Sequence, residues 1–79
     1  MKYWERLEKV EENLGRAVEL LREAVELLKQ AKSIAPESYA VDIEVCEEEL
    51  GKIIEAAQLT LEEVREEIEE EVSFREAES

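Results

Sequence analysis

Apolar residues recur with a period of seven along the first half of the chain. One heptad position holds Leu7, Leu14, Leu21 and Leu28, and a second holds Trp4, Val18 and Val25. Two apolar positions per heptad are the pattern of an α-helix that packs lengthwise against another helix. The pattern predicts a helix over about residues 3–33, about 48 Å long at ~1.5 Å per residue.

Two further rows widen the apolar face of this first helix. One row consists of Val10, Ala17, Ala24 and Ala31, and the other of Leu20, Leu27 and Ile34. At ~100° per residue the whole face spans about 160°, which is more than one partner helix covers. We therefore expect self-association through the residues Ala17, Leu20, Ala24, Leu27, Ala31 and Ile34.

Three residues near the amino end stand apart from the leucine pattern. Tyr3 and Trp4 are interpreted as apolar anchors of the first helix, and a partner-binding aromatic patch is the alternative. Glu11 places an acid where the heptad expects an apolar residue. We expect it to pair with a lysine or arginine or to lie at a frayed edge.

Pro36 marks the clearest interruption of the pattern. Proline lacks a donor and disfavours helix at the residue before it, but it suits a first helical turn, especially with Glu37 behind it. We predict a turn over residues 34–37 and an antiparallel second helix over about 38–72, followed by a frayed tail over 73–79. The apolar stripe of this helix is Tyr39, Ile43, Cys46, Leu50, Ile53, Ile54, Ala57, Leu61, Val64, Ile68 and Val72.

The second helix has one ambiguous place. Thr60 and Glu63 match a capping box, and Leu59 with Val64 would supply a hydrophobic staple, so a short third helix could begin after Leu59. However, no glycine or proline breaks the chain there, and the apolar stripe keeps its phase. We favour a continuous or kinked helix and keep the break as the alternative.

These elements predict a single all-α domain over residues 1–79. Its architecture is an antiparallel helical hairpin, and a domain this small buries only about 60–65% of its extended-chain surface. Two helices also leave part of the 160° face in water. We therefore expect a homo-oligomer, with a dimer that forms a four-helix bundle as the favoured state.

Charge is unevenly distributed along the chain. Residues 1–35 hold seven basic and seven acidic side chains, so the net charge of −13 lies in residues 36–79. The segment Glu62–Glu71 alone contains seven glutamates and one arginine. Lys2, Arg6 and Lys9 would neutralise part of it across an antiparallel hairpin. The second interpretation is a docking surface for a basic protein, formed by Glu62, Glu63, Glu66, Glu67, Glu69 and Glu70.

Composition excludes several classes of function. The acidic balance disfavours binding to nucleic acid and to membrane surfaces, and no apolar run approaches the ~20 residues that span a bilayer. Cys46 is the only cysteine, and it is expected to be a core residue of a cytoplasmic protein. Histidine, the commonest general base, is absent. We expect no cofactor and no metal ion.

The sequence is best interpreted as a protein–protein interaction or assembly module without catalytic activity. One alternative is an acidic inhibitor that imitates nucleic acid and occupies the groove of a basic protein. Another is a fragment related in chemistry to the all-α, Mg²⁺-dependent nucleotide pyrophosphatases, which use paired Glu-x-x-Glu motifs on facing helices. Such spacings occur at Glu5/Glu8, Glu44/Glu47 and Glu63/Glu66, but a chain this rich in glutamate contains them by chance.

Overall fold

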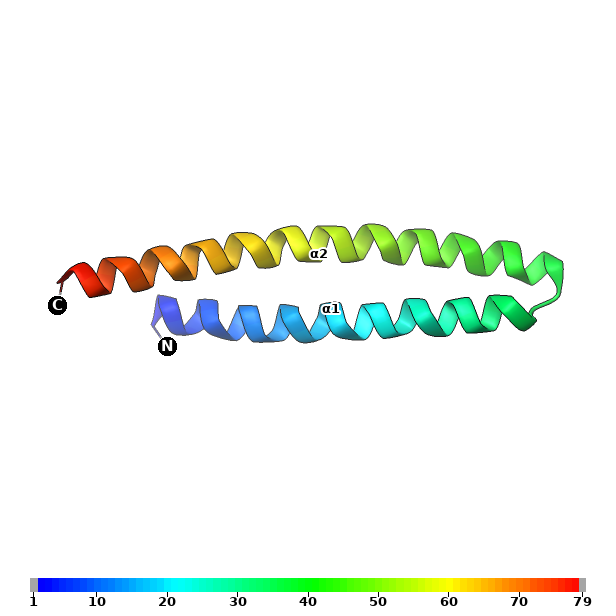
Figure 1. Ribbon diagram of the computed structural model, residues 1–79, viewed down its shortest axis with the longest axis horizontal. Helices are drawn as coiled ribbons and strands as arrows, with labels where there is room; N and C mark the ends of the chain where they lie inside the picture. The colour runs from blue at the N-terminus through cyan, green and yellow to red at the C-terminus, as the bar shows by residue number, and fades with distance from the viewer. Residues whose placement is uncertain (1, 79) are drawn as a thin grey trace.

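Two long helices form an antiparallel hairpin in the computed structural model, which describes residues 2–78 and side chains through Arg75. Helix α1 spans Tyr3–Ile34 and helix α2 spans Glu37–Glu78. They lie side by side along their length, and α2 extends past the start of α1 (Figure 1). The all-α helical hairpin predicted from the heptad pattern is therefore confirmed.

The turn between the helices follows from Pro36. Ala35 has extended backbone angles, φ −76° and ψ 146°, as expected for a residue before proline. The Pro36 carbonyl then accepts the backbone N–H groups of Tyr39 at 3.0 Å and Ala40 at 2.9 Å, which starts α2. Proline suits this position because the N–H that it lacks would have no helical partner there.

Helix α2 passes through Thr60 without a break. The Thr60 hydroxyl donates to the carbonyl oxygen of Ala56 at 3.1 Å, one helical turn back, instead of capping a new helix. The alternative of a third helix after Leu59 is therefore wrong. The unbroken apolar phase from Ala57 to Leu61 explains why the helical continuation prevails over the capping pattern.

The predicted frayed tail over residues 73–79 is also wrong for residues 73–78, which continue α2; Ser79 lies outside the described residues. Glutamate, arginine and alanine favour helix in this segment. The Arg75 guanidinium also lies 4.4 Å from the centroid of the Trp4 ring, a cation–π contact between the carboxyl end of α2 and the start of α1.

The hydrophobic core is a single narrow seam, defined here as the line along which α1 and α2 touch. Among residues 2–75, only Leu7, Val18 and Leu61 are buried, with 8%, 7% and 6% of their surface exposed. The molecule measures 63 × 16 × 16 Å. Its accessible surface is 6219 Å², whereas a compact monomer of 9.2 kDa would expose about 4,900 Å². The hairpin therefore leaves about 1,300 Å² more in water than a compact fold would.

Candidate interaction surface

The outer flank of α1 is apolar and uncovered. Leu20, Leu27 and Ile34 expose 47%, 64% and 86% of their surface, and Ala31 is exposed beside them. Ala17 and Ala24 are half-buried at the edge of the seam. The residues expected to mediate self-association thus form one continuous flank that the hairpin itself does not cover. This flank is named the α1 flank below.

A second apolar row extends this surface onto α2. Tyr39, Cys46 and Ile53 follow one another at heptad spacing and are all exposed. Glu67 continues the same row, and its carboxylate Oε2 accepts a hydrogen bond from the Tyr3 hydroxyl at 2.7 Å. Because Tyr3 belongs to the row of Val10 and the alanines on α1, this contact shows that the two rows share one side of the hairpin.

The prediction that Cys46 is a core residue is wrong. Its thiol is exposed. The apolar stripe read from the sequence of α2 combined seam residues such as Ile43 and Leu50 with flank residues such as Cys46 and Ile53, which lie about one quarter turn away. In a two-helix structure only the seam residues are covered.

The opposite side of the hairpin is polar. It holds a shallow, open groove of about 350 Å³, lined by Gly15, Val18, Glu19, Arg22, Gln58, Leu61, Glu62 and Arg65. Most of these side chains are charged or carry amides, and the groove is open to solvent. Leu20, Leu27, Ile34, Tyr39 and Ile53 thus lie on the side opposite this groove, whereas Val41, Val45, Leu59 and Val72 are exposed elsewhere on α2.

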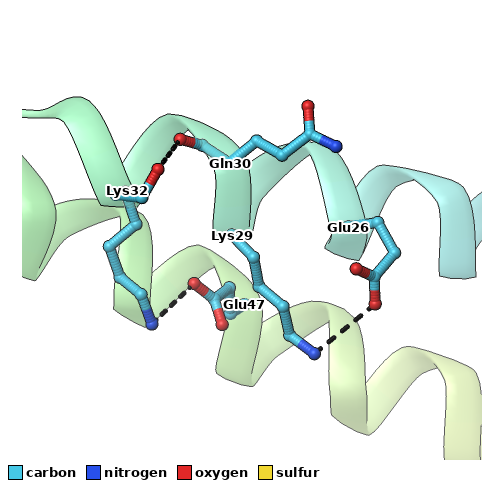
Figure 2. Close-up of polar contacts among 6 residues, drawn as sticks. Glu26, Lys29, Gln30, Lys32 and Glu47 are labelled. Atoms are coloured by element: carbon cyan, nitrogen blue, oxygen red, sulfur yellow. Dashed lines mark hydrogen bonds and ion pairs between the residues drawn. The ribbon is translucent and has the colours of Figure 1, made fainter.

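Among the side chains of residues 2–75, two ion pairs cross the seam, one toward each end. Near the turn, Lys32 Nζ lies 2.9 Å from Glu47 Oε1, and the side chains are 35% and 15% exposed (Figure 2). Near the open end, Arg65 Nε donates to Glu11 Oε2 at 3.2 Å. Glu11 therefore pairs with a basic residue, which was one of its two predicted outcomes. Glu47 is half-buried between the helices.

The Lys32–Glu47 contact combines a short polar contact with charge attraction. Glu47 Oε1 is enclosed and accepts no well-directed hydrogen bond, although the ammonium is close enough for one. The short polar contact with Glu47 raises the pKa of Lys32 above its ordinary value of 10.5, against a smaller opposing effect of burial. The charged form of Lys32 is therefore favoured in the folded chain.

The acidic segment Glu62–Glu71 has the neighbours that one interpretation predicted, but among residues 2–75 it makes no direct ion pair with them. It does lie beside the start of α1, as the Tyr3–Glu67 hydrogen bond shows. Among residues 2–75, however, no ion pair joins its glutamates to Lys2, Arg6 or Lys9. Instead, the hydrogen bond to Glu67 and, more weakly, burial and nearby acidic charge raise the pKa of Tyr3. The six glutamates predicted as a partner surface are all exposed.

The described residues bring no carboxylates together in a metal-binding arrangement. No group of three or more acidic or cysteine side chains between residues 2 and 75 is close enough to hold an ion, so the Glu-x-x-Glu spacings do not converge. Neither helix, over the same residues, has a stretch that is long and apolar enough to cross a membrane.

Comparisons with known proteins add no relative. No family model matches the sequence, and neither curated proteins nor solved structures give a match.

Proposed function

We propose that this chain is a protein–protein interaction or assembly module without catalytic activity, and that it self-associates into a dimer with four helices. The observation that carries the proposal is the uncovered α1 flank, with Leu20, Leu27 and Ile34 in water. Large apolar side chains gathered on one side of a molecule mark an interaction surface, whereas single scattered ones do not.

The surface area supports this proposal quantitatively. The excess of about 1,300 Å² per chain over a compact monomer corresponds to about 2,600 Å² for two chains. Stable protein–protein interfaces bury about 1,200–2,000 Å² in total, and obligate dimers bury more. One hairpin thus exposes as much surplus surface as its half of a dimer interface requires. Burying it would also supply the core that a two-helix molecule lacks.

A matched pair of substitutions tests the proposal. Leu27 on the α1 flank and Leu59 on the outward side of α2 are almost equally exposed, at 64% and 62%. Leu27→Lys should convert the dimer to a monomer in sedimentation equilibrium, because it places a charge in the interface. Leu59→Lys should leave the dimer intact. Equal effects of the two substitutions, or no effect of Leu27→Lys, would contradict the assignment of the α1 flank.

A second candidate function is supported by the unpaired acidic segment. Glu62, Glu63, Glu66, Glu69 and Glu70 point away from α1 and have no basic partner among the described residues. We infer that this ridge could bind a basic protein, including as an imitation of nucleic acid. Such binding to a basic probe, for example polylysine, should weaken steeply with salt and with Glu66→Lys and Glu70→Lys together. Leu27→Lys should not affect it.

A further inference from the structure

We propose, on the basis of the self-association above, that the second copy packs its α1 antiparallel against the α1 flank, with both α2 helices on the outside of the dimer. The dimer is then organised as α2–α1–α1–α2, with the neutral helices central and the acidic helices apart. This arrangement commits the uncovered flank to one occupant, a second copy of the same helix.

Charge decides which helix lies at the centre. Residues 1–35 are neutral, whereas residues 36–79 carry all of the −13 charge. A dimer that stacked α2 on α2 would bring two strongly negative helices to packing distance, about 8–10 Å, where their charges are poorly screened at ordinary salt. A dimer that joins the α1 helices places them as far apart as four parallel rods allow.

The outward rows of the two helices lead to the same conclusion. On α1 the row farthest from the seam on the apolar side carries Leu20, Leu27 and Ile34, preceded by Arg6 and Asn13. The equivalent row of α2 carries Asp42, Glu49, Ala56, Glu63 and Glu70, all exposed. An interface around the flank of α1 meets one charged side chain of this row, Arg6, at its amino end, but around α2 it would bury four carboxylates, which is costly. The apolar surface is therefore centred on α1.

A charged row beside the α1 flank sets the direction of the second helix. It holds Lys2, Lys9 and Arg16 in the amino half of α1, and Glu23 and Gln30 in the carboxyl half. A parallel pair would place each basic residue beside its own copy. An antiparallel pair places the basic amino half of one α1 against the carboxyl half of the other, which contains Glu23. The two helix dipoles then point in opposite directions, which is favourable.

Complementarity of this row further specifies the register. Full overlap of the two α1 helices places Leu20 near the two-fold axis and Arg16 opposite Glu23 of the second copy, once on each side. Within one chain Arg16 contacts Glu19 at 3.2 Å, but both side chains are mostly exposed. Exposed pairs of this kind are weak, so Arg16 can exchange that partner for Glu23 of the second copy.

Cysteine cross-linking tests the direction of packing in the full chain, with Cys46→Ser as background. In the antiparallel register Lys9 lies opposite Gln30 of the second copy and about 30 Å from its own copy along the axis. A mixture of the Lys9→Cys and Gln30→Cys variants should therefore form a mixed disulfide under mild oxidation, with little Lys9→Cys homodimer. A Lys9→Cys homodisulfide formed as rapidly as the mixed one would overturn the antiparallel arrangement.

A charge swap tests the register. Glu23→Arg alone should weaken dimerisation about fivefold or more, because two Arg16–Glu23 contacts become repulsive, although the variant is less negative overall. The double variant Arg16→Glu/Glu23→Arg has the net charge of the original chain and should recover the original affinity. As the control, Glu66→Arg on the outside of α2 makes the same charge change and should not weaken the dimer. A double variant as weak as Glu23→Arg would overturn the register.

The outcomes separate this inference from the proposed function. A chain that remains monomeric at every concentration contradicts self-association and the α1–α1 interface together. A dimer that resists Leu27→Lys but dissociates with Ile53→Lys contradicts the α1 flank as the interface and the central position of α1, but not self-association, and places the contact over the α2 row instead. A dimer with the mixed disulfide and the recovered charge swap establishes the α2–α1–α1–α2 order.

Discussion

Lys32 Nζ and Glu47 Oε1 lie 2.9 Å apart across the seam, and the seam positions next to this pair are apolar. Near the other end of the hairpin Glu11 occupies the equivalent seam position of α1 and contacts Arg65. Each acid lies three residues before a Leu-Gly pair: Glu11 before Leu14–Gly15 in α1, and Glu47 before Leu50–Gly51 in α2. Paired charges in a helical seam fix alignment more reliably than they add stability.

The first prediction concerns this pair. Glu47→Gln should lower the melting temperature, because it leaves the partly buried Lys32 ammonium without its carboxylate. The double variant Lys32→Met/Glu47→Leu replaces the pair by apolar side chains and should melt at or above the temperature of the original chain. Thermal unfolding followed by circular dichroism measures both. A double variant less stable than Glu47→Gln would show that the ion pair itself stabilises the hairpin.

The second prediction concerns the Tyr3–Glu67 hydrogen bond at the open end. Because the pKa of Tyr3 is raised above 10.0 in the folded chain, the bond stabilises the fold fully below pH 10.0 and is lost as the pH rises through the raised pKa. Absorbance titration at alkaline pH, in a Tyr39→Phe background, reports Tyr3 alone. Glu67→Gln should move its pKa back toward 10.0, whereas Glu62→Gln should not. An unchanged titration in Glu67→Gln would exclude this contact as the cause.

The third prediction compares two leucines that lie two positions apart. Leu61 is 6% exposed in the seam, so Leu61→Ala should lower the free energy of unfolding by about 2–3 kcal/mol. Leu59 points outward, and Leu59→Ala should change it by less than about 0.5 kcal/mol. Urea unfolding measures both values. Similar losses in the two variants would mean that α2 is rotated from the orientation described.

The fourth prediction concerns the two helix-interior glycines. An added Cβ at Gly15 or at Gly51 would meet nothing within 4 Å. Gly15→Ala and Gly51→Ala should therefore each raise the free energy of unfolding by about 0.5–1 kcal/mol, through helix propensity and reduced freedom of the unfolded chain. A loss of stability on substitution, measured at a concentration where the chain is associated, would indicate that a second copy approaches this polar side rather than the α1 flank.

The heptad pattern of α1 and the Pro36 turn were sufficient to predict the hairpin. Leu7 and Leu14 belong to a heptad pattern that favours a long helix, and Pro36 favours a turn. The local sequence is therefore enough to indicate these elements. The carboxyl end of α2 was harder to predict, because its apolar stripe ends at Val72. There Arg75 contacts Trp4, which is far from it in the sequence, so no local pattern indicates this contact.

The candidate surface was predictable in part. The rows of Leu20 and Leu27 follow from helical angles alone, and the structure places them in water as a continuous flank. The position of Cys46 was not predictable in the same way, because seam and flank residues of α2 are equally apolar and only the facing helix distinguishes them. Counting the heptads of α2 from Ala40 would have placed Glu47 in the seam and Cys46 outside it.

Sedimentation equilibrium of the full chain, over a range of protein concentration at low and moderate salt, tests self-association most directly. The account predicts a mass of twice 9.2 kDa. It also predicts that the dimer becomes tighter at moderate salt, because salt screens the repulsion between two chains of charge −13. A mass that remains at 9.2 kDa at every concentration and salt level would contradict it, and the α1 flank would then have no second copy to cover it.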